Sequence, residues 1–273
     1  MKPQEINQFN IPVELKKRLT DVQYFTEIDS TNTEAMRQLD SGKTGNFLLL
    51  AHAQSAGKGR RGRIWQSPAG AGIYLTLVRP FARDIKELQA LSLVTALSVQ
   101  EALALSAVSG IQLKWPNDLL VNKRKLAGIL LELKQCNGVN YVVFGVGINL
   151  NLPNAVREAI DQPVTDLMSL SQAIPDKSLL VTIVVETLLN NLLEFVKTAF
   201  ASFQSRWNAL DCYRHLDIML QIGDVQKIGR SMGVNESGAL LLQTASGLEV
   251  IRGGEVFPSL LAAVRSSESG CAV

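Results

Sequence analysis

Residues 111–149 read IQLKWPNDLLVNKRKLAGILLELKQCNGVNYVVFGVGIN, and this stretch decides the fold class. Apolar segments at 111–115 and 119–122 flank Pro116, which cannot donate a ladder hydrogen bond and therefore sets a turn. The chain turns again at 123–124 into a segment at 126–133, forming a hairpin. Asn137-Gly138, a strong hairpin signal, leads into a strand at 141–149. The stretch predicts an antiparallel centre for the sheet.

The flanking sequence adds further strands and the helices. Alternation at 22–28 and apolar runs at 47–53 and 72–78 predict strands, and capping side chains at 29–32 predict a helix to about residue 39. Apolar periodicity predicts long helices at 85–107, 177–200 and 201–210. Short, glycine-broken segments at 215–255 are typical of a small β-barrel. We expect an α+β protein with a mixed, largely antiparallel central sheet backed by helices.

The composition excludes several classes of protein. The chain has 273 residues, is 47% hydrophobic and carries a net charge of +2, which fits a globular protein and disfavours a broad nucleic-acid-binding face. Cys136, Cys212 and Cys271 form no CxxC pair, and only His52 and His215 offer imidazole, so we expect no disulfide framework, His-based metal site or triad. No signal peptide or membrane-spanning run is expected, which predicts a cytoplasmic location.

A basic, glycine-rich loop follows the predicted strand at 47–53. Residues 57–63 read GKGRRGR, which places three glycines and four positive charges in seven positions. Glycine lets backbone N–H groups approach a ligand, successive N–H groups form an anion-binding nest, and guanidinium groups match phosphate or carboxylate. Taken alone, the loop fits an anionic small-molecule site, a nucleic-acid patch or a solvated basic loop.

The KWPND motif at 114–118 and the strand after it offer a second set of functional groups. Asn117 and Asp118 would present oxygens from a rigid corner that could hold hydrated Mg²⁺, although the motif taken alone favours an Asx turn between strands. Lys125 is either a solvated flank or a lysine that stabilises charge in a transition state. Gly128 would let a ligand approach the backbone closely.

Residues 145–149 read GVGIN, but no helix follows them, so we reject a dinucleotide-binding site. A glycine-lined strand against which a planar ring lies is the better interpretation, with Asn149 as a polar contact. Ser30 and Thr31 are helix caps or hydroxyls that hydrogen-bond an uncharged polar group. Together with the basic loop and Lys125, these groups fit activation of a carboxylate by ATP, where cations offset the repulsion between two anions.

The motifs occur in the order seen in bacterial biotin protein ligases, and residues 22–257 resemble that family. The likeness rests on DSTN at 29–32, Gln54, the 57–63 loop, KWPNDL at 114–119, RKLAGIL at 124–130 and GVGIN. It implies a class II synthetase-like catalytic fold followed by an SH3-like β-barrel. The implied division is an N-terminal extension at 1–21, a catalytic domain at 22–211, a C-terminal SH3-like domain at 212–265 and a mobile tail at 266–273.

The resemblance also implies a two-step reaction. Biotin and MgATP give biotinyl-5′-AMP and pyrophosphate, and a lysine of a biotin carboxyl carrier protein, a subunit of acetyl-CoA carboxylase, then takes the biotinyl group. Lys125 and Arg60 would be catalytic, and Asp118 would hold Mg²⁺. The implied biotin-binding residues are Ser30, Thr31, Asn32, Gln54, Lys58, Gly59, Arg60, Lys125 and Gly128. The implied ATP-binding residues are Arg60, Arg61, Arg63, Trp65, Asn117 and Asn149.

Three departures from the family pattern and two alternatives remain. Lys58 replaces a usual arginine and loses the bidentate fork. After Gly253-Gly254-Glu255 the chain lacks the arginine often found there. The residues before the first strand are too few for the helix-turn-helix of family members that repress transcription, so we expect no DNA-binding function. The alternatives are a lipoate or octanoate transferase of related fold and a nucleic-acid-binding regulator. Exposed edge strands could pair two chains into a homodimer.

Overall fold

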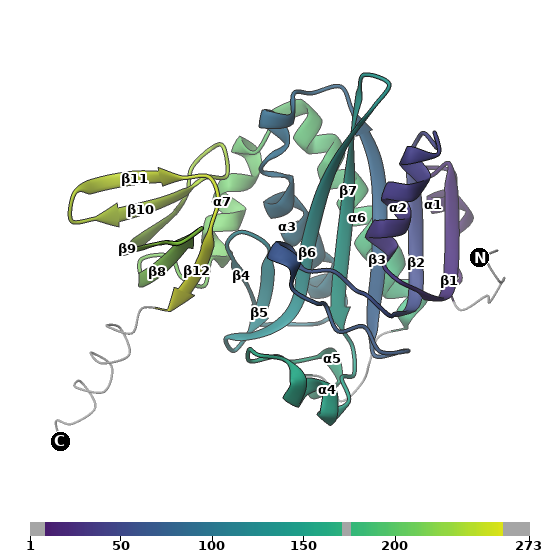
Figure 1. Ribbon diagram of the computed structural model, residues 1–273, viewed down its shortest axis with the longest axis horizontal. Helices are drawn as coiled ribbons and strands as arrows, with labels where there is room; N and C mark the ends of the chain where they lie inside the picture. Colours follow the sequence, from purple (N-terminus) through teal and green to yellow (C-terminus); the bar gives the residue numbers. More distant parts are fainter. Residues whose placement is uncertain (1–8, 171–175, 259–273) are drawn as a thin grey trace.

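Two β-sheets carry the fold of this computed structural model, which describes residues 9–170 and 176–258 (Figure 1). The first sheet has seven strands in the order β1-β2-β3-β7-β6-β5-β4. Only its β1–β2 pair is parallel, which confirms a mixed, largely antiparallel sheet. Its strands are β1 (Asp21–Ile28), β2 (Phe47–Gln54), β3 (Gly72–Phe81), β4 (Ile111–Lys114), β5 (Asp118–Val121), β6 (Arg124–Cys136) and β7 (Val139–Asn149).

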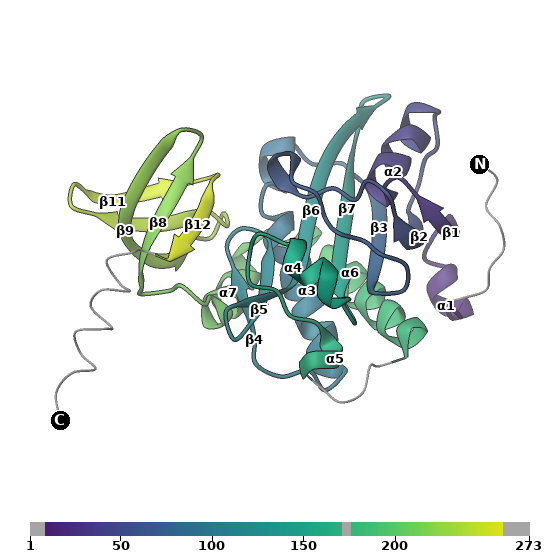
Figure 2. The ribbon, with the colours of Figure 1, turned by 60° about the horizontal axis from the view of Figure 1, so that its bottom comes forward.

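The second sheet is the small C-terminal β module that the glycine-broken segments predicted. Five antiparallel strands lie in the order β11-β10-β9-β8-β12, next to the β4–β5 end of the first sheet (Figure 2). Trp115, from the KWPND motif, donates its Nε1–H to the carbonyl of Gly238 and so links the two parts. The strands are β8 (Asp217–Ile222), β9 (Val225–Val234), β10 (Leu240–Thr244), β11 (Gly247–Ile251) and β12 (Glu255–Pro258).

Helices cover both faces of the first sheet. On one face α3 (Leu91–Leu105) packs against α6 (Lys177–Thr198), with α7 (Ala201–Leu210) beside them, and on the other face lies α2 (Thr31–Asp40) (Figure 1). The shorter helices are α1 (Val13–Lys16), α4 (Asn154–Ala159) and α5 (Leu167–Leu170). The single helix expected at 85–107 is wrong at its start, because a 3₁₀ turn, η2 (Ile85–Leu88), precedes α3.

Helix α6 corrects the expectation that no segment is apolar enough to cross a membrane. An 18-residue window of this helix has a mean hydropathy of 1.8, so the helix is long and apolar enough to cross a membrane by length and composition alone. However, 56% of that window is buried inside the fold, where Leu188, Leu192 and Phe195 are fully enclosed. These contacts are those of a core helix, although Leu179, Leu193 and Val196 of α6 stay exposed on its outer side.

Alternation along β7 positions the site. Phe144 and Val146 point into the main core beneath α3 and α6, whereas Tyr141 and Val143 join a smaller cluster under α2. Because successive strand residues face opposite sides, Gly145 and Gly147 continue the α2 face. The α2 face of β7 therefore carries no side chains at these two positions.

The domain boundaries stay predictions, but several details bear on them. Ile11 and Leu15 pack into the main core, so the residues before β1 are integrated with the first sheet. The expected tail at 266–273 lies outside the described residues. Asp211, at the expected boundary, forms an isolated bridge with Leu113. Its Oδ1 accepts from the Tyr213 N–H, while its enclosed Oδ2 has no hydrogen-bond partner among the described residues.

We expect Asp211 to weaken the fold as the pH rises from about 4 to about 6. Burial raises the pKa of Asp211 to about 6, whereas an aspartate in an unfolded chain titrates near 3.9. Between these values the unfolded chain releases a proton that the folded chain retains, so stability falls with rising pH. Asp211→Asn should therefore gain stability relative to wild type from about pH 4 to about pH 7 in urea unfolding. Asp161→Asn, at an exposed carboxyl, is the control. If the free energy of unfolding of wild type and of Asp211→Asn changed with pH in the same way, the expectation would be contradicted.

Candidate functional site

The site lies on the α2 face of the first sheet, where glycines leave the strand backbone bare. A Cβ on Gly145 would lie 2.4 Å from Asn32 Oδ1, and one on Gly147 would lie 2.5 Å from the indole of Trp65. A Cβ on Gly128, on the neighbouring strand, would lie 3.0 Å from the same indole. The ring that lies against this strand in the structure is the indole of the chain's own Trp65, and the close approach of a ligand's planar ring stays a prediction.

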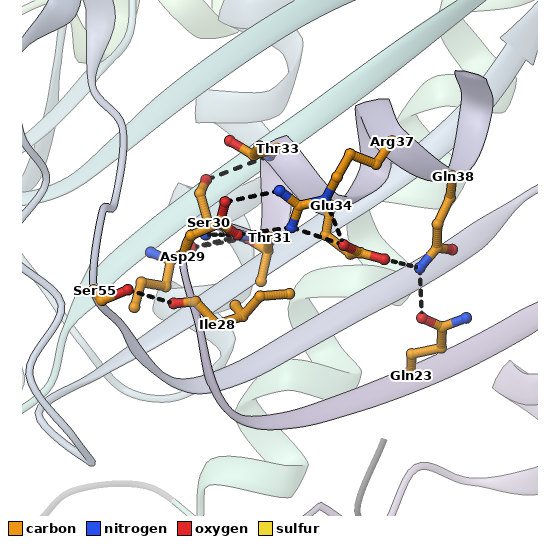
Figure 3. A network of polar contacts seen from close by, with 11 residues as sticks. Gln23, Ile28, Asp29, Ser30, Thr31, Thr33, Glu34, Arg37, Gln38 and Ser55 are labelled. Atoms are coloured by element: carbon orange, nitrogen blue, oxygen red, sulfur yellow. Dashed lines mark hydrogen bonds and ion pairs between the residues drawn. The ribbon is translucent and has the colours of Figure 1, made fainter. Parts of the chain in front are cut away.

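The start of α2 is held by a polar network (Figure 3). The Ser30 hydroxyl accepts from the Thr33 N–H and caps the helix. Asp29 forms two hydrogen bonds of 2.8 Å with the Arg37 guanidinium, and Arg37 also pairs with Glu34. The hydrogen bond from Arg37 lowers the pKa of Asp29 to about 2. The network fixes where the helix begins and so where the next two side chains point.

Three polar side chains line one end of the resulting cavity. Thr31 and Asn32 are 3% and 4% exposed, although each carries a polar group that needs a partner. Gln54 Oε1 accepts from both the backbone N–H and the hydroxyl of Thr31, at 2.9 and 3.1 Å. Gln54 Nε2 donates to Ser67, which orients the amide. This end is thus a set of fixed hydrogen-bonding groups beside an apolar wall.

The basic loop reaches from this cavity to the second sheet. Arg60 donates to Asn117 Oδ1 at 3.1 Å and to the Gly254 carbonyl at 3.5 Å. Burial lowers the pKa of Arg60, and the charge of Arg61 adds to this. Arg63 binds both carboxylate oxygens of Glu255 on β12, at 2.6 and 2.5 Å. The loop's guanidinium groups therefore contact both parts of the protein.

Glu255 balances part of this positive charge. Burial alone would raise the pKa of Glu255, but its hydrogen bond with Arg63 and the charges of Arg63, Lys114 and Arg61 outweigh burial and lower the pKa. The Lys114 ammonium lies 5.4 Å from the centre of the Phe257 ring, and burial lowers its pKa. The sequence singled out neither residue as part of a site, since only folding brings β12 to the loop.

Lys125 lies at the centre of the site. Its Nζ is 2.8 Å from Asp118 Oδ1, and both side chains are 13% exposed. Its Nζ also lies 5.4 Å from the centre of the Trp65 ring. The expectation of a solvated flank is therefore wrong, because the ammonium is enclosed between a carboxylate and an indole.

Two adjoining cavities contain most of the predicted site residues. The first, the polar cavity, is lined by Ser30, Thr31, Asn32, Gln54, Lys58, Gly59, Arg60, Trp65, Asn117, Lys125 and Gly128. The second, the cationic cavity, is lined by Arg61, Arg63, Asp118, Lys114, Gln162 and Glu255. Five residues line both cavities: Gly59, Arg60, Trp65, Asn117 and Lys125. Asn149 lines neither cavity.

Asn149 supports the site from behind. It is 4% exposed, and its Nδ2 donates to the carbonyl of Thr165 at 3.0 Å and to that of Lys125 at 3.4 Å. These bonds link β7 to the backbone of Lys125, so Asn149 has a structural role in the chain. Its predicted contact with a nucleotide stays a prediction.

The side chains of the site include few groups that could bind a metal ion. The described residues hold no group of three or more His, Cys, Asp or Glu side chains that could bind a metal. Two carboxylates line the cationic cavity: Asp118 pairs with Lys125, and Glu255 is held by Arg63. A single carboxylate suits Mg²⁺, which keeps several waters and shares its shell with substrate phosphates.

Comparison with known proteins identifies the family. Residues 24–149 match the model of the biotin/lipoate A/B protein ligase family. The chain is 34% identical to the bifunctional ligase/repressor BirA of Escherichia coli, over 84% of this chain and 71% of that one. It is 34% identical to the biotin–[acetyl-CoA-carboxylase] ligase of Paracoccus denitrificans, over 84% of this chain and 97% of that one.

Solved structures are similar to this chain in the same family. The biotin protein ligase of Aquifex aeolicus, in complex with biotin and ATP, superposes with a TM-score of 0.73 at 28% identity, over 88% of this chain and 98% of that one. The chain belongs to the biotin/lipoate A/B protein ligase family, in its biotin protein ligase branch.

We expect Gly147→Ala to displace the Trp65 indole, since the added methyl group would lie 2.5 Å from the ring. Acrylamide should then quench the tryptophan fluorescence more strongly, because Trp115 and Trp207 are 3% and 0% exposed and stay protected. Gly253→Ala is the matched control, since no heavy atom lies within 4 Å of its added Cβ. Quenching of Gly147→Ala equal to that of wild type would show that the indole does not depend on the bare strand.

Proposed function

We propose that this chain is an ATP-dependent biotin protein ligase that activates biotin as biotinyl-5′-AMP and transfers it to a lysine of a biotin carboxyl carrier protein. One observation carries the proposal: the polar cavity and the cationic cavity share Arg60, Trp65, Asn117 and Lys125 along their common border. A carboxylate held in the first cavity can meet a phosphate held in the second at this border. Membership of the biotin protein ligase family supports the same reaction.

In the first step a carboxylate oxygen of biotin attacks the α-phosphorus of ATP, and pyrophosphate leaves. Both reactants are anionic, so their approach requires cations that are already in place. Lys125 and Arg60 lie at the common border and supply them, while Lys114 lies further into the cationic cavity. Their partial burial strengthens this effect, because the field of a charge is less screened away from water.

In the second step the ε-amino group of the carrier lysine attacks the acyl carbonyl of biotinyl-5′-AMP, forming an amide and releasing AMP. The basic loop supports this step by covering the intermediate, which excludes water from a reactive anhydride. Arg60, Lys58 and Gly59 line the polar cavity from the loop side. Arg61, Arg63 and Trp65 would face the nucleotide.

Mg²⁺ would enter on the phosphates of ATP and neutralise the charge of the leaving pyrophosphate. Asp118 fits as its protein ligand, with Asn117 beside it, and its ion pair with Lys125 would then be shared with the metal. A cytoplasmic location accords with the need for ATP. Of the edge strands β1 and β4, the second is already bridged by Asp211 at Leu113, so pairing of two chains into a homodimer would use β1.

Transfer of labelled biotin tests the proposal directly. With MgATP and an apo carrier domain, the purified chain should place the label on one lysine, identified by mass spectrometry. The same reaction with labelled lipoate or octanoate tests the runner-up activity, since the family model also covers lipoate ligases. Absence of biotin transfer by the folded protein, together with transfer of lipoate, would replace the proposed activity by the alternative.

Lys125→Ala should slow formation of biotinyl-5′-AMP by about 10²-fold or more, as loss of a transition-state donor does in other enzymes. Biotin affinity should fall much less, because the ammonium acts chiefly on charge that develops in the reaction. Single-turnover adenylation and equilibrium binding separate these two effects. Lys134→Ala, at a lysine of the same strand that pairs with Asp40 away from both cavities, is the control. Equal losses of adenylation and affinity would argue against a role in the transition state.

A further inference from the structure

A chain of hydrogen bonds, partly buried at Glu132 on β6 and fully buried at Thr76 on β3, runs beneath the polar cavity to the start of α2. Asn32 Nδ2 donates to Glu132 Oε2 at 2.8 Å and lies 3.4 Å from the carbonyl of Leu130. Thr76 Oγ1, from β3, lies 2.7 Å from Asn32 Oδ1 and 2.8 Å from Thr31 Oγ1. Thr76 is 0% exposed and does not line the cavity, so it acts only through its neighbours.

The donors and acceptors along this chain have a single consistent direction. The carboxylate of Glu132 and the carbonyl of Leu130 only accept, so the side of Asn32 that faces them is its NH₂ group. Asn32 Oδ1 therefore faces Thr76, and an amide oxygen can only accept. The single hydroxyl proton of Thr76 is thus committed to Asn32, which leaves the Thr76 oxygen as an acceptor toward Thr31.

The consequence falls on Thr31. The one hydroxyl proton of Thr31 can be donated to either of two oxygens of the protein, Thr76 Oγ1 at 2.8 Å or Gln54 Oε1 at 3.1 Å. The proton stays on the protein side in either case. The Thr31 oxygen therefore offers the cavity a lone pair, and the cavity accepts an N–H group at this point rather than another acceptor.

We propose that Thr76 and Glu132 are positioning residues that fix the Thr31 hydroxyl as a hydrogen-bond acceptor and thereby select substrates with an N–H donor. The inference rests on the proposed function, because the ureido ring of biotin carries two N–H groups. An analogue in which oxygen replaces one of these N–H groups would place two acceptors face to face. A site built for a donor rejects such an analogue, because its buried polar group is left unpaired.

Gly145 makes this arrangement possible. A Cβ there would lie 2.4 Å from Asn32 Oδ1. Any residue other than glycine at position 145 would therefore displace the Asn32 amide from Thr76. The hydrogen-bond chain thus crosses three elements, β6, α2 and β3, through a gap in the side chains of β7. Thr76 is fully buried on β3, where an unpaired hydroxyl would be costly, and its contacts with Asn32 and Thr31 satisfy it.

The test compares the binding of two ligands to three forms of the protein. Calorimetry measures the Kd of biotin and of its cyclic carbamate analogue, with one N–H replaced by oxygen, for wild type, Thr76→Val and Thr76→Ser. Wild type should prefer biotin by about tenfold or more, in line with the cost of one unpaired buried group. Thr76→Val should reduce this preference several-fold, because the Thr31 hydroxyl then keeps only the longer contact with Gln54 Oε1, at 3.1 Å, to hold its proton away from the ligand. Thr76→Ser keeps the hydroxyl and should restore the preference.

Substitutions of Glu132 provide a second, independent test of the proposal. Glu132→Gln retains an oxygen that accepts from Asn32 and should keep the preference for biotin, whereas Glu132→Ala should reduce it. In steady-state assays the Val and Ala variants should raise the KM for biotin with little change in kcat. An equal loss of affinity for both ligands, with the preference intact, would overturn the proposal and assign these residues a structural role only. Failure of wild type to bind biotin would instead contradict the proposed function, so the two failures are distinguishable.

Discussion

The absence of side chains at Gly128, Gly145 and Gly147 is the constraint on which the site depends. These positions share one face of β6 and β7, and their bare backbone receives the Trp65 indole and the Asn32 amide at distances that a Cβ would forbid. The opposite face of the same strands packs Phe144 into the main core. One pair of strands therefore serves as core on one side and as binding surface on the other.

The second sheet belongs to the site as well as to the fold. Arg63 donates to Glu255 from both terminal nitrogens of its guanidinium group, and Arg60 donates to the Gly254 carbonyl, so the basic loop bridges the two parts of the protein. Glu255 offsets like-charge repulsion in a loop that carries four positive charges. An anionic ligand would compete with this carboxylate for the same guanidinium groups, which couples ligand binding to the position of the second sheet.

Local patterns predicted most elements, and the errors have physical causes. The strands at 111–149 followed from turn residues and apolar segments, whereas the helix at 85–107 was drawn too long because periodicity does not distinguish a 3₁₀ turn from the first turn of an α-helix. Lys125 was weighed as a solvated flank, although its ammonium is enclosed by Asp118 and Trp65. Thr76 and Glu132 were missed because a threonine between two leucines of β3 and a glutamate near the polar end of β6 are weak signals without the partners that explain them.

The sequence by itself determined the order of the elements, the basic loop, the KWPND corner and the likeness to biotin protein ligases, because turn residues, alternation and motif spacing are local properties of the chain. Only the tertiary structure decided which groups meet. Glu255 joins the loop from more than 190 residues away, and Thr76 joins Asn32 through a gap left by Gly145. Hydrogen bonds and ion pairs depend on distances of a few ångströms, and residues so far apart in the chain reach those distances only when the sheets have formed.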